Sequence, residues 1–242
     1  MWDASEIRAL SFDTGGTVLD WHSGFRTAFA QAGRRHGLER DWTTLANELR
    51  SRALGRTLNM GRDEPPPYNI DEVHRRTLDE LCSEFELDAF TDDERHGIAW
   101  TAIHSLDAWP DFGPVLPRLR SRYPVCSHTV LSFRIIVDTA RHNGLDWDAV
   151  FSCEAIGIYK TLPESYETVA GWLALEPSQI MKVACHATDL NAARAVGYRT
   201  AFVLRPDEWG TAPVPDPADI DPGPDCDIVV DTFDQLADAL GV

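Results

Sequence analysis

The chain has 242 residues, of which 43% are hydrophobic and 25% are charged. This composition is typical of a folded globular protein and excludes a disordered one. The formal net charge is −17, and a surface this acidic repels nucleic acid and anionic membranes, so neither is an expected partner. An acidic substrate would need a local Arg or Lys in order to bind.

The cysteines and the N-terminal segment indicate a location. The five cysteines are scattered and form no CxxC pair, which favours reduced thiols over a disulfide framework. Residues 1–13 contain no basic segment followed by a long apolar run, so we expect no signal peptide. No stretch approaches the roughly 18 apolar residues of a membrane-spanning helix. We therefore expect a cytoplasmic protein.

The first part of the chain predicts one strand followed by a helical block. Residues 7–12 form a short apolar run that ends at Asp13, before the turn-forming sequence TGGT. From there to residue 107, apolar residues recur at spacings of three and four, as on the buried face of a helix. The Pro-rich segment 61–69 interrupts this pattern and cannot be helical. The predicted helices cover 23–37, 42–55, 70–85 and 92–106.

After Trp109 the predicted elements alternate between helix and strand. Gly144 is expected to close one helix, and Thr232 with Gln235 resembles a capping box for the last one. The proline- and aspartate-rich segment 207–225 is expected to be a surface loop. The predicted strands cover 123–128, 149–153, 179–186, 199–205 and 227–231. The predicted helices cover 114–122, 131–144, 163–175, 190–197 and 234–240.

This order of elements predicts an α/β fold with a Rossmann-like, three-layer core built on a parallel sheet. The core would comprise residues 1–22 and 108–242, and residues 23–107 would form an inserted α-helical cap domain. In open parallel sheets, ligands bind beyond the carboxyl ends of the strands. Polar residues at those positions are therefore the candidates for a functional site.

Four polar clusters are predicted to follow strands, and they begin at Asp13, Ser127, Tyr159 and His186. Taken singly, each has a structural explanation, since a carboxylate can cap a turn and a lysine is usually a surface charge. Taken together, they would place the carboxylate of Asp13 beside the ammonium of Lys160. An adjacent ammonium keeps a carboxylate ionised and able to act as a nucleophile.

The sequence FDTGGTVLDW at 12–21 resembles motif one of the haloacid dehalogenase (HAD) superfamily, and most closely that of its 2-haloacid dehalogenase branch. The resemblance continues through Tyr159-Lys160, and it is strongest in VACHATDLNAARAVGYRTAFVLRPDEWG at 183–210. In the predicted cap, LANELRSR at 45–52 resembles the stretch that holds a substrate-binding Arg. The resemblance covers nearly the whole chain and implies the fold described above.

The resemblance also implies roles for individual residues. Asp13 would be the nucleophile that attacks the halogen-bearing carbon, and Lys160 would orient and ionise it. Arg50 would bind the substrate carboxylate through its planar guanidinium. The motif-two hydroxyl would be Thr129, with Ser127 as the rival. The supporting residues would be Thr17, which fixes the nucleophile loop, and Tyr166 and Asp189, which support Lys160 and the hydrolytic water.

Three positions depart from the usual patterns. Phosphatases of the superfamily carry a second Asp where this chain has Gly15, and Gly15 can neither protonate a leaving group nor support magnesium well. His186 stands where an acidic ligand would help to bind a metal, so no metal and no cofactor is expected. His186 lies beside the site and is instead a candidate for contact with substrate or water. Dehalogenases usually have an aromatic residue at position 15 and an Asn in motif two. Gly15 and Val130 should therefore give a larger and more apolar pocket.

These features leave several functions open. The leading hypothesis is a 2-haloacid dehalogenase that uses no metal and acts on a small carboxylate substrate. A second hypothesis keeps the nucleophile but assigns a larger electrophile, as in a biosynthetic pathway. A third is a binding protein that has lost activity, and a fourth, a phosphatase, is disfavoured by Gly15. Many members of the family are dimers, so the resemblance also admits a homodimer.

Overall fold

The computed structural model describes residues 4–61 and 66–242, and its sheet contains six strands that pair in parallel. The spatial order is β3-β2-β1-β4-β5-β6. The predicted parallel α/β core is therefore confirmed, with strands somewhat shorter than expected. The strands are β1 (Ala9–Phe12), β2 (Val125–Thr129), β3 (Ala149–Ser152), β4 (Ile180–Ala184), β5 (Arg199–Val203) and β6 (Ile228–Val230).

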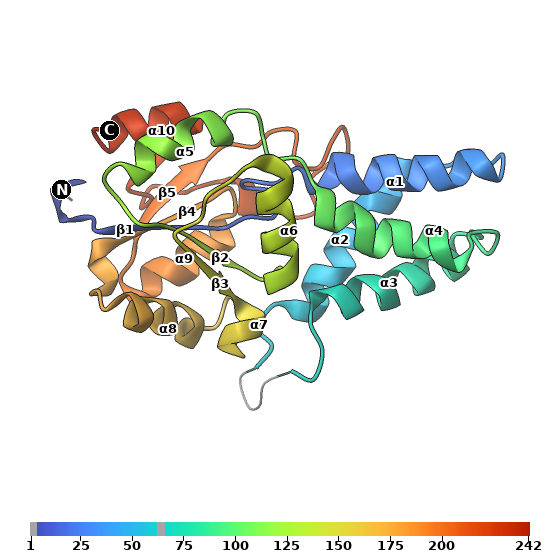
Figure 1. The fold of residues 1–242 in the computed structure, drawn as a ribbon, viewed down its shortest axis with the longest axis horizontal. Helices are drawn as coiled ribbons and strands as arrows, with labels where there is room; N and C mark the ends of the chain where they lie inside the picture. The colour runs from blue at the N-terminus through green and yellow to red at the C-terminus, as the bar shows by residue number, and fades with distance from the viewer. Residues whose placement is uncertain (1–3, 62–65) are drawn as a thin grey trace.

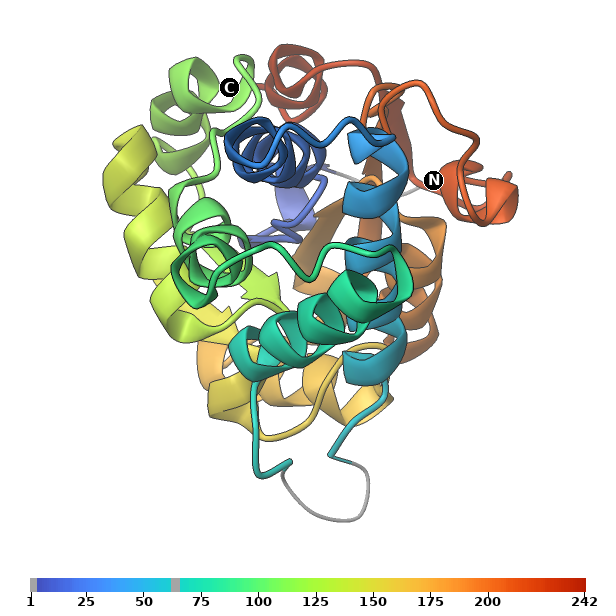
Figure 2. The ribbon, with the colours of Figure 1, turned by 90° about the vertical axis from the view of Figure 1, so that its right-hand side faces the viewer.

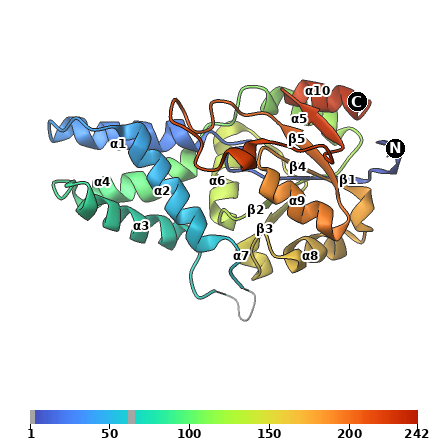
Figure 3. The ribbon, with the colours of Figure 1, turned by 180° about the vertical axis from the view of Figure 1, so that it is seen from behind.

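Helices cover both faces of this sheet, which gives three layers (Figure 1). Every residue of β1, β2 and β4 is buried, as expected of strands with a helical layer on each side. One face carries α5 (Phe112–Arg120), α6 (Phe133–Asn143) and α10 (Phe233–Ala239). The opposite face carries α8 (Pro163–Leu173) and α9 (Ala187–Val196), which Figure 3 shows from behind.

Four further helices form a separate group beyond one end of the sheet (Figure 1), and Figure 2 shows this group in front of the sheet. Their buried residues lie at the predicted spacings; in α1, for example, Phe25, Phe29 and Ala32 are buried. None of the helices in the described residues is long and apolar enough to span a membrane. The group comprises α1 (Trp21–Arg35), α2 (Trp42–Thr57), α3 (Ile70–Glu84) and α4 (Asp92–His96).

Two adjacent segments connect this helical group to the sheet. Leu19 forms an antiparallel bridge with Ala108. The N–H of Asp20 donates to the carbonyl of Asp107 at 2.9 Å, and the N–H of Trp109 donates to the carbonyl of Val18 at 2.8 Å. The predicted domain boundaries at residues 22 and 107 fall beside this paired crossing. The division into core and cap stays a prediction.

The predicted helix 92–106 changes its winding partway along. The α-helix ends at His96, and a π-helical segment, Gly97–Ala102, and a 3-10 turn, Ile103–Ser105, follow it. Ile98 and Ile103 are both buried although they are five residues apart, a spacing that suits the wider π turn. The pattern of threes and fours in the sequence did not distinguish these forms.

Two local predictions concerning the polar clusters were wrong. A short helix, α7 (Cys153–Ile156), follows β3 because the Ser152 hydroxyl accepts the N–H of Glu154 and caps it. Lys160 therefore lies in the loop after α7 and not directly at a strand end. Helix α9 begins at Ala187, earlier than the predicted residue 190, so Asp189 lies in its first turn, where the helix dipole favours a negative charge.

The remaining turn predictions are largely confirmed. Gly144 adopts a left-handed conformation at the end of α6. Thr232 caps α10 by accepting the N–H of Gln235, but the Gln235 side chain accepts from Asp231 and does not complete a capping box. Segment 207–225 is irregular apart from a 3-10 turn, Pro217–Ile220. Within the Pro-rich segment 61–69, the described residues are not helical, and 62–65 lie outside the described residues.

Candidate active site

Asp13 lies directly after β1, and three side chains contact its carboxylate, two of them from distant parts of the chain. The Nζ atom of Lys160 is 2.8 Å from Oδ1. The Thr17 hydroxyl donates to Oδ2 at 2.8 Å, and Nδ1 of His186 lies 3.2 Å from the same oxygen. Burial alone would raise the pKa of Asp13, but Lys160, His186 and Lys182 hold it well below its ordinary value. The carboxylate is therefore ionised and fixed in orientation.

Lys160 connects Asp13 to a second buried carboxylate, that of Asp189. Its Nζ atom lies 2.7 Å from Oδ2 of Asp189, and the Tyr166 hydroxyl donates to Oδ1 at 2.7 Å. Burial would lower the pKa of Lys160, but the two carboxylates raise it above its ordinary value. The structure thus brings together four of the predicted catalytic residues around one ammonium group.

A second buried lysine, Lys182 on β4, was missed by the sequence analysis. Its Nζ atom lies 3.3 Å from Oδ2 of Asp189 and donates to the carbonyl of His128 at 3.2 Å. Burial lowers its pKa to about 8 despite the neighbouring Asp189. The available signal was a lysine inside the otherwise apolar strand IMKVA. With Lys182, two ammonium groups balance the two carboxylates.

The two candidates for the motif-two hydroxyl lie behind the nucleophile loop. Thr129 accepts a hydrogen bond from the Thr14 hydroxyl at 2.7 Å and another from the N–H of Leu131. The Ser127 hydroxyl is buried without a hydrogen-bond partner among the described residues. Neither hydroxyl forms a hydrogen bond with Asp13 in the described structure. Thr129 therefore contacts the loop that carries Asp13 through Thr14.

A cavity of about 110 Å³ opens beside Asp13. One side is polar, and the other is apolar, formed by Leu54 and Leu58 of α2 together with Val130. Arg50 and His186 also line it, so most of the predicted substrate-binding residues face this space. The complete lining is Asp13, Arg50, Leu54, Leu58, Val130, Lys160, Thr161, His186, Thr188, Asp189 and Asp219.

Gly15 allows the side chain of Arg50 to approach the loop that carries Asp13. The buried Arg50 guanidinium donates from Nη2 to the Gly15 carbonyl at 3.1 Å and lies over the Trp21 ring. A Cβ atom on Gly15 would lie 3.0 Å from that Nη2. The expectation that Gly15 enlarges the pocket stays a prediction, and the Arg50 guanidinium lies beside the space that a side chain at 15 would enter. Its Nε atom has no hydrogen-bond partner within the described residues, so the guanidinium retains capacity to bind a ligand.

Glu208, in the loop after β5, is the second residue that sequence reasoning missed. Its buried carboxylate accepts the indole N–H of Trp21 at 2.9 Å, and Nε2 of His186 lies 3.0 Å from the same oxygen. Burial would raise the pKa of Glu208, but His186, Trp21 and Arg50 hold it below its ordinary value. A Cβ atom on Gly16 would lie 2.1 Å from this carboxylate, so Gly16 leaves room for it.

One group of donor atoms is compact enough to surround a metal ion. Ligand atoms of Cys185, His186 and Glu208 lie within 4.8 Å of one another. Each is already engaged, since His186 pairs with Glu208, and burial raises the pKa of the Cys185 thiol to about 11, which keeps it protonated. Magnesium prefers oxygen ligands, which this group does not supply in number. We therefore assign the three residues to a hydrogen-bonded cluster.

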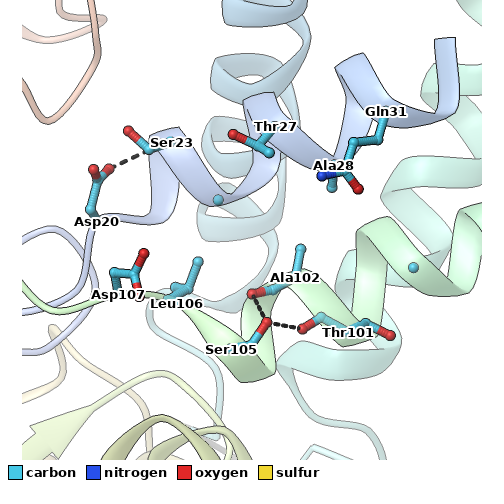
Figure 4. A pocket seen from close by; sticks show the side chains of 12 residues that line it. Asp20, Ser23, Thr27, Ala28, Gln31, Thr101, Ala102, Ser105, Leu106 and Asp107 are labelled. Carbon is cyan, nitrogen blue, oxygen red and sulfur yellow. Dashed lines mark hydrogen bonds between the residues drawn. The ribbon is translucent and has the colours of Figure 1, made fainter. Parts of the chain in front are cut away.

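Two larger cavities lie away from these charges. One, of about 320 Å³, separates α1 from residues 97–107, and Figure 4 shows that most of the side chains lining it are small or polar, including Thr27 and Ser105. Another, of about 500 Å³, is bounded by Tyr68, Trp100 and Glu154 among others. Neither is lined by a carboxylate in contact with a lysine. The chemistry therefore points to the smaller cavity at Asp13.

Known proteins resemble the chain over nearly its whole length, although no family model matches it. It is 33% identical to a defluorinating L-2-haloacid dehalogenase of known structure, with 98% of this chain and 96% of that chain covered and a TM-score of 0.87. A second L-2-haloacid dehalogenase structure is 30% identical, with 97% and 99% covered and a TM-score of 0.84. (S)-2-haloacid dehalogenase 4A of Burkholderia cepacia is 26% identical over 227 residues, which cover 86% of this chain and 89% of the relative.

The buried charges give a prediction for stability. Lys160→Met leaves the two carboxylates with Lys182 as their nearest remaining ammonium, so we expect it to lower the free energy of unfolding by about 3–5 kcal/mol. The double variant Asp13→Asn/Lys160→Met restores the balance of buried charge and should be more stable than Lys160→Met alone. Urea unfolding at pH 7 measures the free energy of unfolding of each single variant and of the double variant. Simple addition of the two single effects would show that Asp13 and Lys160 are not coupled.

Proposed function

The chain belongs to the 2-haloacid dehalogenase branch of the HAD superfamily of hydrolases, and we propose that it converts a small 2-haloacid into the 2-hydroxyacid with Asp13 as nucleophile. The observation that carries this proposal is the contact of Asp13 with Lys160 at the edge of a cavity that also holds Arg50. The small volume favours a short acid over a larger electrophile. The absence of a carboxylate at Gly15 weighs against phosphoryl transfer.

In the first proposed step, a carboxylate oxygen of Asp13 attacks the carbon that bears the halogen. A C–O bond forms as the C–halogen bond breaks, and the halide leaves with the electron pair. Arg50 binds the substrate carboxylate, and Val130 with the α2 leucines contacts the apolar part of the substrate. Attack from the side opposite the halide inverts the configuration at this carbon.

In the second step, water attacks the carbonyl carbon of the Asp13 ester. The bond between that carbon and the alcohol oxygen breaks, so the configuration at the substrate carbon does not change again. Lys160 and Thr17 hold the Asp13 carboxyl group in place throughout, and Tyr166 and Asp189 hold Lys160. This scheme requires no metal and no cofactor. The five free cysteines support a cytoplasmic location as part of the same proposal.

A single-turnover experiment in ¹⁸O-labelled water tests the nucleophile. With enzyme in excess over 2-chloropropionate, the product hydroxyl should carry unlabelled oxygen, because it comes from Asp13, and the label should enter Asp13 instead. Asp13→Asn should remain folded by circular dichroism and show no turnover, since an amide is a far weaker nucleophile. Labelled product in the first turnover would mean that water attacks the substrate directly.

Arg50 and Arg52 form a matched pair for testing substrate binding. Arg50 is buried in the cavity wall, whereas Arg52 is paired with Glu48 and Glu84 at the surface. Arg50→Ala should reduce kcat/KM for a carboxylate substrate. The loss of transition-state stabilisation should be about 2–4 kcal/mol, the scale for losing one partner of a buried charge pair. Arg52→Ala should change it far less. Equal and small effects would remove Arg50 from substrate binding.

Chelation tests the proposed independence from metal. Gly15 supplies no side-chain oxygen, and the ammonium of Lys160 lies beside Asp13, so we expect the same turnover before and after dialysis against EDTA. Halide release is the measurement, with parallel samples that receive Mg²⁺ afterwards. Activity that is lost on chelation and returns with Mg²⁺ would contradict the proposal.

A further inference from the structure

Hydrolysis of the proposed Asp13 ester requires a base, because the attacking water must lose a proton. Several ionisable groups near Asp13 are poorly suited to this task. The Asp189 carboxylate is occupied by Tyr166 on one oxygen and by Lys160 and Lys182 on the other. Lys160 is itself held as an ammonium between two carboxylates, and burial raises the pKa of Tyr166 well above its ordinary value.

His186 has the geometry that these groups lack. It lines the cavity, its side chain is 15% exposed, and its Nδ1 atom lies 3.2 Å from Oδ2 of Asp13. Its other ring nitrogen, Nε2, lies 3.0 Å from Oε1 of Glu208. The indole N–H of Trp21 and the Cys185 thiol also donate to the Glu208 carboxylate, which fixes its position.

The Glu208 carboxylate selects one form of the neutral imidazole. A carboxylate can only accept, so the Nε2 atom of His186 carries a proton and donates it to Glu208. The lone pair of the neutral ring is then on Nδ1, the nitrogen that faces Asp13. We propose that His186, oriented by Glu208, is the general base that activates water for hydrolysis of the Asp13 ester; this inference rests on the proposed function.

The surrounding charges change in the direction that such a base needs. In the resting enzyme, burial would lower the pKa of His186, but Cys185, Glu208 and Asp13 raise it well above its ordinary value. The ring is then protonated and donates to Asp13. Formation of the ester neutralises Asp13, while Arg50 beside Glu208 and Lys160 beside Asp13 remain positive. The proton on Nδ1 loses one of the anions that held it and passes to solvent.

The proton balance closes over the cycle. Neutral His186 takes one proton from the water as the water oxygen attacks the ester carbonyl. The second proton of that water goes to the departing alcohol oxygen when the ester bond breaks. Asp13 is regenerated as a carboxylate beside a protonated His186, which is the resting arrangement. One proton reaches solvent per turnover, as replacement of a halide by a hydroxyl requires.

Rapid-quench kinetics with 2-chloropropionate separate the two steps. His186→Asn should release about one halide per enzyme in a burst, then turn over roughly 100-fold more slowly or worse. Intact-mass spectrometry should show esterified Asp13 accumulating. His142→Asn, which alters an exposed histidine paired with Asp107, should match the wild type. His186→Gln repeats the test with a second amide in case the first variant folds poorly.

Glu208→Gln tests the orienting carboxylate. The amide oxygen can still accept from Nε2, but the negative charge that favours the protonated ring is gone. Ester hydrolysis should slow less than in His186→Asn, and the acid limb of its pH profile should move to lower pH. A merely structural role for Glu208 would lower the rate without moving that limb.

The outcomes distinguish this inference from the proposed function. A normal halide burst in His186→Asn with no accumulated ester would overturn the role of His186 and leave the nucleophile of Asp13 intact. Accumulation of ester in Asp219→Asn instead would assign the base to Asp219, the other carboxylate lining the cavity. No halide release from the wild type, or a labelled product hydroxyl in its first turnover in ¹⁸O-labelled water, would overturn the proposed function and this inference with it.

Discussion

The site is organised by the need to keep one carboxylate ionised out of contact with bulk water. Asp13 is almost fully buried, and an unpaired charge there would cost several kcal/mol. Lys160 compensates for this charge, and Asp189, which accepts a hydrogen bond from Tyr166, contacts the same ammonium group. Asp13, Lys160 and Asp189 come from three different connections at one end of a parallel sheet. The parallel sheet therefore brings these connections, and the charged residues that they carry, close together.

Side chains from two distant segments hold the loop that carries Asp13. The Trp109 indole donates to the Gly16 carbonyl at 2.6 Å, and the Arg205 guanidinium donates to the Thr17 carbonyl at 3.0 Å. Trp109 belongs to the segment that returns from the helical group, beside the paired crossing at Leu19 and Ala108. The loop that carries Asp13 thus contacts both the segment that returns from the helical group, through Trp109, and the segment after β5, through Arg205.

Much of this arrangement could be predicted from the sequence because it follows local patterns. The buried strand before Asp13 and the alternating elements after Trp109 have clear periodicities, and the motif around Lys160 is distinctive. Glu208 was missed because nothing in its neighbourhood marks it as a buried charge, and the lysine inside the apolar strand IMKVA does not by itself show what Lys182 contacts. Their role depends on residues far along the chain that approach them in space. The same reason explains why Arg50 was expected near the substrate but not beside Gly15.

The two adjacent glycines of the nucleophile loop link that loop to residues far away in sequence. A side chain at 15 would meet the Arg50 guanidinium, and one at 16 would meet the Glu208 carboxylate. The present positions of the Arg50 guanidinium and the Glu208 carboxylate therefore depend on the absence of side chains at these two positions. Two hydrogen atoms in the loop thus leave room for one positive and one negative group beside Asp13.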